Sequence, residues 1–268
     1  MKNIFYILCL VIIADNSFAQ QKDYVAIRFE NFINGKKLEL NDKIYTNAFG
    51  ENFSISKLKY YISNIRIVGD TTGHSQSIDH FSKKFFPNAK EEINRQLDQF
   101  KSNIFLIDAS GQNNIYISKP SLNIIALTDL KLEFWVGVDS ILNCSGAQEG
   151  ALDPLNDMFW TWNNGYVNFK MEGESKNSRA DKNRIEYHIG GYKTGQKTLQ
   201  HIYLPLNLNL NFCSLEVRLD LDKYWNGVNQ IKISSSPVIV APGKQAVDVA
   251  SNFKEMFSVE GTDWHIPL

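Results

Sequence analysis

The sequence predicts an all-β protein, built as a two-sheet antiparallel β-sandwich with a short helical insertion. Short runs in which apolar and polar residues alternate recur along most of the chain, and this period of two is typical of half-buried strands. Glycine, asparagine and aspartate separate the runs, as they do in hairpins and Greek-key connections. Many short strands of this kind indicate two packed sheets.

The expected strands follow from the alternation. In residues 23–32, Val25, Ile27 and Phe29 alternate with charged or small residues, which predicts one buried face. Residues 53–68 are rich in β-branched and aromatic residues, which favour strands. The same reasoning places further strands at 38–45, 104–108, 114–118, 130–138, 165–172, 184–189, 198–206, 214–221 and 230–234.

The pattern breaks at about residues 70–103. There Ile93, Leu97 and Phe100 recur at helical spacing, which predicts a short amphipathic helix inserted between two strands. No internal repeat is evident. We therefore expect a single domain spanning residues 20–268.

Residues 1–19 have the features of a secretory signal peptide. Lys2 supplies the positive charge, residues 4–13 the apolar core, and residues 17–19 (SFA) a cleavage site with small residues. The apolar core is too short to span a bilayer, and no later run is long enough. We expect cleavage before Gln20 and a periplasmic or secreted protein without a membrane span.

The charge balance argues against two classes of partner. The formal net charge of the chain is −1, and removal of the signal peptide, which carries one Lys and one Asp, leaves that charge unchanged. Neither nucleic acid nor an anionic membrane surface is therefore an expected partner.

Two tryptophans, Trp160 and Trp162, are separated by one residue, so on a strand both side chains would project from the same face. Such a pair usually belongs to a sandwich core. Here residues 145–154 read as a long loop, and residues 163–165 (NNG) read as a turn. A strand enclosed by two loops lies near a rim of the fold, where binding sites form.

The surrounding motifs resemble those of a known family. Between residues 137 and 173 the chain carries, in order, GVDS, N-x-SGAQ-x-GALDP, MFWTW, NGY and K-x-EG. This succession is similar to the MbnP-like copper-binding protein family, in its Bacteroidetes-type branch. The resemblance continues at residues 45–51, 58–65, 105–108 and 187–191, and so covers most of the mature chain.

The resemblance implies a binding protein and not an enzyme. It implies copper as the bound metal, and a tryptophan that a partner di-haem peroxidase-like enzyme oxidises to kynurenine. Trp162, flanked by turn residues, is the more accessible candidate for this modification, and Trp160 is the more core-like one.

Copper takes imidazole, thiolate, thioether or carboxylate ligands. None of the five histidines forms a closely spaced pair, so a site must assemble from distant strands. His188 is the first candidate ligand because it lies in the matched motif YHIGG, and His201 on a later strand is the second. A lone histidine otherwise tends to have a structural role. His74 and His80 fall in the insertion, outside the resemblance, and His265 is expected in a mobile C-terminal tail.

Two cysteines remain after cleavage of the signal peptide, Cys144 and Cys213. In an oxidising compartment an even number of cysteines favours a disulfide. The alternative is a copper-binding thiolate at Cys144. Family members closer to the namesake carry Asn-His where this chain has Asn143-Cys144, so the resemblance implies either that Cys144 replaces an imidazole or that the copper site is altered.

Conventional catalytic motifs are not found. The sequence has no nucleophile–His–acid pattern, phosphate-binding loop or haem-attaching C-x-x-C-H. Asp139 and Asp153 are read as residues that anchor a loop and form a turn, respectively. The alternative to a copper protein is a metal-free extracytoplasmic interaction module that docks a protein or small ligand through its Trp-bearing face.

Overall fold

A computed structural model describes residues 24–71, 103–111, 113–118, 127–161, 163–206 and 214–262. Several predicted features lie outside these residues: the signal peptide, the helix of the insertion, Trp162, Cys213, His74, His80 and His265. Within the described residues, no helix has the length and apolar character needed to cross a membrane.

The described strands form two mixed sheets, and the smaller contains five of them. These strands are β1 (Tyr24–Ile33), β2 (Lys36–Lys37), β6 (Asn114–Ser118), β12 (Ser214–Asp220) and β14 (Phe257–Thr262). As the alternation predicts, Val25, Ile27 and Phe29 of β1 are buried. Strand β1 pairs with β2 and β6 antiparallel but with β12 parallel. The prediction of purely antiparallel sheets is therefore wrong, because alternation fixes a strand's buried face but not the direction of its partner.

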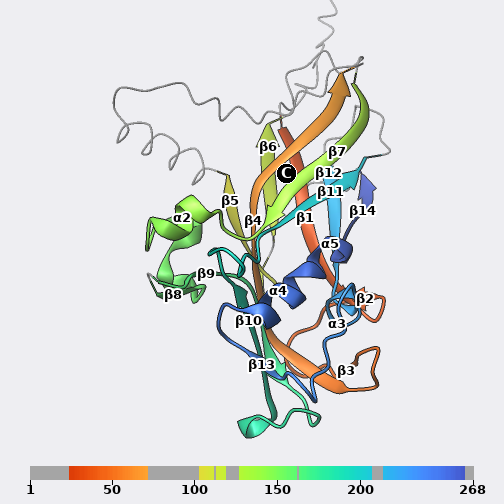
Figure 1. The fold of residues 1–268 in the computed structure, drawn as a ribbon. Coiled ribbons are helices and arrows are strands. Elements are labelled where there is room, and N and C mark those ends of the chain that lie inside the picture. Colours follow the sequence, from red (N-terminus) through yellow and green to blue (C-terminus); the bar gives the residue numbers. More distant parts are fainter. Residues whose placement is uncertain are drawn as a thin grey trace, which may run out of the picture.

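The larger sheet follows the order β11-β7-β4-β9-β10-β13, with β3 and β5 also paired to β4 and β8 paired to β9. The strands are β3 (Tyr45–Thr46), β4 (Asn52–Thr71), β5 (Ile104–Asp108), β7 (Leu127–Val136), β8 (Phe159–Thr161), β9 (Gly165–Glu174), β10 (Arg184–Gly190), β11 (Gln200–Pro205) and β13 (Val238–Ile239). Strands β10 and β13 are parallel. Irregular pairing along β4 accompanies the curl of β4 and β7 in Figure 1.

The main core lies between the inner faces of the two sheets. It contains Ile27 of β1, Val217 of β12, Tyr60 of β4 and Phe134 of β7. Helices α3 (Asp222–Trp225), α4 (Lys244–Ser251) and α5 (Phe253–Met256) add Trp225, Val249, Phe253 and other residues to this core. The fold is mostly β, as predicted, with a few short helices that the strand pattern did not indicate.

Two segments predicted as strands are irregular in the structure, and their backbone hydrogen bonds show why. Residues 38–45 cross between the sheets: the Leu38 N–H donates to Asn31 of β1, and the Asn41 N–H donates to Ile55 of β4. In residues 230–234, the Ile233 and Ser234 N–H groups donate to the carboxylate of Glu51 and not to a neighbouring strand. In both segments the backbone donors are satisfied outside a continuous ladder.

Candidate functional site

The tryptophan motif lies in a segment that covers the outer face of the larger sheet, which we call the covering segment (residues 137–161). It contains α2 (Ser140–Cys144), the 3₁₀-helices η2 (Gly150–Leu152) and η3 (Pro154–Asn156), and strand β8. In Figure 1 it is the green lobe beside β4 and β5. Asp139 caps α2 by accepting from the Ile141 N–H, and Asp153 caps η3 by accepting from the Leu155 N–H, which confirms the structural roles predicted for both.

A second apolar cluster fixes the covering segment to the sheet. Tyr61 of β4 and Tyr166 of β9 meet edge to face there, with ring centroids 6.0 Å apart, beneath Leu142, Leu152 and Met158. Both tyrosine hydroxyls donate to carbonyls of the covering segment, Tyr61 to Ala151 and Tyr166 to Gly146 and Leu152. Burial raises the pKa of Tyr166 to about 12, so its hydroxyl remains a donor.

Asn143 joins α2 to the sheet. Its side chain is 2% exposed; Oδ1 accepts from the Tyr166 N–H at 2.8 Å, and Nδ2 donates to the carbonyls of Val138 and Asp139. The fit requires a glycine at position 165, where φ is +72° and a Cβ would collide with Asn143 Oδ1. The neighbouring Cys144 is exposed, and Cys213 lies outside the described residues, so their disulfide stays a prediction.

Trp160 lies against the strand that carries His188. Its ring is half-buried, packs on the second cluster and contacts Gly190, the last residue of β10. His188 precedes Gly190 by two residues, and its side chain points away from the buried Tyr187 and Ile189. The structure therefore brings Trp160 next to the strand of His188.

The His188 ring is held by a carboxylate. Its Nε2 atom lies 2.8 Å from Oε1 of Glu172 on the neighbouring strand β9, and the His188 side chain is 16% exposed. The hydrogen bond from His188, together with Lys57 and Lys170, outweighs the effect of burial and lowers the pKa of Glu172 to about 2. Glu172 is therefore a charged acceptor that fixes the orientation of the imidazole.

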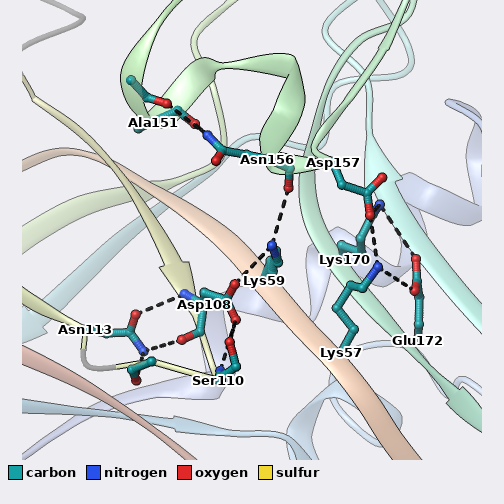
Figure 2. A network of polar contacts seen from close by, with 12 residues as sticks. Lys57, Lys59, Asp108, Ser110, Asn113, Ala151, Asn156, Asp157, Lys170 and Glu172 are labelled. Atoms are coloured by element: carbon teal, nitrogen blue, oxygen red, sulfur yellow. Dashed lines mark hydrogen bonds and ion pairs between the residues drawn. The ribbon is translucent and has the colours of Figure 1, made fainter.

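Figure 2 shows the ion pairs that continue from Glu172. Lys57 Nζ lies 3.1 Å and Lys170 Nζ 3.6 Å from the Glu172 carboxylate, and both ammonium groups lie 2.9 Å from Oδ2 of Asp157 in the covering segment. The sequence reasoning did not identify these four residues. Alternation on β4 and β9 predicts that Lys57, Lys170 and Glu172 face outward, but it does not say which strand is their neighbour.

The structure does not bring the other predicted ligands to His188. His201 on β11 stacks on Trp135 of β7 with a centroid distance of 4.7 Å, and β7, β4 and β9 lie between β11 and β10. Cys144 is the exposed last residue of α2. Within the described part of the chain, no three side chains of His, Cys, Asp or Glu are grouped to hold a metal ion.

Comparison with known proteins places the chain in a family. The family model described as MbnP matches residues 22–242, which is most of the chain. The solved structure of MbnP from Methylosinus trichosporium is similar, with a TM-score of 0.54. The match covers 89% of this chain and 98% of that chain at 14% sequence identity, so the similarity concerns the fold. No curated protein matches. The chain belongs to the MbnP family.

Proposed function

We propose that the protein is an exported, non-catalytic copper-binding protein in which His188 supplies an imidazole ligand. MbnP proteins are generally non-catalytic and bind copper. The observation that carries the proposal is the pairing of His188 with Glu172. Histidines that bind metals donate their second ring N–H to a carboxylate or carbonyl, which fixes the ring and its tautomer. With Nε2 engaged by Glu172, Nδ1 is the nitrogen left to donate to copper.

His188 can supply one ligand of a copper site, but the side chains near it do not complete the site. The described residues contain no group of three His, Cys, Asp or Glu side chains suited to a metal ion. The two lysines beside Glu172 oppose direct coordination by its carboxylate, because they already neutralise it. Glu172 therefore acts as the residue that orients His188, and not as a ligand.

We further propose that a tryptophan of the motif is the residue oxidised to kynurenine, with the partner di-haem enzyme as the oxidant. Trp160 lies against the His188 strand with its ring half-buried. Trp162, which the sequence predicts to be the more accessible of the two, is the other candidate. Peptide mass spectrometry of the native protein distinguishes the two, because they differ in position within one peptide.

The metal content of protein purified from its native envelope tests the proposed function. Copper should be the metal that co-purifies, and a chelator should remove it. Native protein without copper, which also fails to take up added copper, would support the metal-free interaction module instead.

A further inference from the structure

Asp157 links the covering segment to the charged residues of the sheet. It lies between η3 and β8 with φ 62° and ψ 34°, a left-handed conformation that aspartate and asparagine tolerate better than most residues. Its Oδ2 atom contacts the ammonium groups of Lys57 and Lys170, each at 2.9 Å (Figure 2). Asp157 is the member of this network that comes from the covering segment.

The ion pair with Asp157 is important for Lys170, because Lys170 is buried. Its side chain is 4% exposed, and a buried ammonium group without a carboxylate partner is strongly destabilising. Asp157 Oδ2 at 2.9 Å is a closer partner than the Glu172 carboxylate at 3.6 Å. Without Asp157, the two lysines would share Glu172, the carboxylate that holds His188.

The chain after Asp157 leads directly to the tryptophan. The next residue, Met158, is fully buried, and its carbonyl accepts from the Val167 N–H of β9 at 2.8 Å. Strand β8 begins at Phe159, and Trp160 is its second residue. Asp157 therefore directly precedes the residues that pair with β9 and carry the Trp160 ring to Gly190.

We propose that Asp157 is a positioning residue that holds β8 and Trp160 beside the His188 strand through its ion pairs with Lys57 and Lys170. By sharing the ion pairing of both lysines with Glu172, it also leaves Glu172 Oε1 to orient His188. The role of Asp157 in orienting His188 rests on the proposed function, whereas its role in placing β8 does not depend on copper.

Hydrogen–deuterium exchange of the copper-free mature protein (residues 20–268) tests the proposal. Asp157→Asn removes the charge but keeps a side chain suited to the left-handed conformation. Amides of residues 150–161 should exchange at least about tenfold faster, because charge-assisted hydrogen bonds are lost. The variant Asp181→Asn, which alters an exposed carboxylate in η4 (Asp181–Asn183), is the matched control and should exchange like the unaltered protein.

A double variant tests whether faster exchange in Asp157→Asn comes from the lost ion pair or from the changed shape of the side chain. Adding Lys170→Met to Asp157→Asn removes the buried ammonium group that had lost its nearer carboxylate, so exchange should return towards that of the unaltered protein. Three results would overturn the proposal: unchanged exchange in Asp157→Asn, no recovery in the double variant, or equal acceleration in β1 and β12, which would give Asp157 a global role. Because no copper is present, these results are independent of the proposed function.

Discussion

The benzene ring of the Trp160 indole lies directly against Gly190. A Cβ atom at residue 190 would come 2.8 Å from Cζ3 of Trp160, closer than real Cβ contacts, and 3.1 Å from Cη2, tighter than most of them. It would also come 2.5 Å from the carbonyl oxygen of Tyr166. The absence of a side chain at Gly190 is thus what allows the two sequence motifs, MFWTW and YHIGG, to pack together.

Replacing this glycine should displace the tryptophan. We expect Gly190→Ala to lower the free energy of unfolding by about 1–3 kcal/mol through overpacking, and to change the near-ultraviolet circular dichroism of Trp160. Denaturant unfolding and the spectrum measure the two effects. Gly111→Ala is the control, since its Cβ would come no closer than 3.8 Å to a neighbour. Identical spectra for Gly190→Ala and the unaltered protein would contradict the contact.

Asn143 should be needed for stability, although it lies beside an exposed cysteine. Asn143→Ala leaves the buried Tyr166 N–H and the Val138 carbonyl without their partner, which should cost about 1–3 kcal/mol of unfolding free energy. Thermal or denaturant unfolding measures this loss. Cys144→Ser, at the next position, is the control, with all proteins fully reduced so that no disulfide contributes, and it should leave stability nearly unchanged because Cys144 is exposed. Equal effects of the two substitutions would show that Asn143 does not support the covering segment.

Most strands could be predicted from alternation, because their buried faces are continuous apolar stripes. Residues 114–118 match β6 in full, and the long strand expected at 53–68 is β4. Parallel pairing and the crossing at residues 38–45 could not be predicted. They depend on partners distant in sequence, such as β12 for β1.

The site was predictable only in part. The motif containing His188 and the one containing Trp160 identify residues that the structure brings together, because Gly190 and Gly165 mark close backbone approaches. The carboxylate of Glu172 and its lysines required the order of the strands, which periodicity does not contain. His201 was also a candidate because it too lies on a predicted strand. In the structure it stacks on Trp135 instead.

Glu51 should make stability depend on pH. Burial disfavours the charged carboxylate, but hydrogen bonds from Ser234, Asn47 and Ile233 outweigh it and hold the pKa of Glu51 below its ordinary value of 4.5. Its contribution is therefore present above that value and is lost as the pH falls through the lower pKa of the folded state. Glu51→Gln should lower the unfolding free energy at neutral pH by about 1.5–3 kcal/mol and flatten its acid dependence. Parallel pH curves for the two proteins would refute this role.

The two cysteines of the mature chain should be paired. Such a bond would add roughly 2–4 kcal/mol of stability in an oxidising compartment. Thiol titration of the unfolded, unreduced native protein should detect no free thiol. Two free thiols would rule out the Cys144–Cys213 bond and would return Cys144 to the candidate copper ligands.

Copper titration of the metal-free mature protein, comparing His188→Ala with His201→Ala, decides whether His188 is a copper ligand. We expect His188→Ala to abolish binding, because it removes the ligand imidazole. His201→Ala should bind like the unaltered protein, and Glu172→Gln should bind about 10–100-fold more weakly because the His188 ring loses its carboxylate. Unchanged copper affinity in His188→Ala would contradict the account.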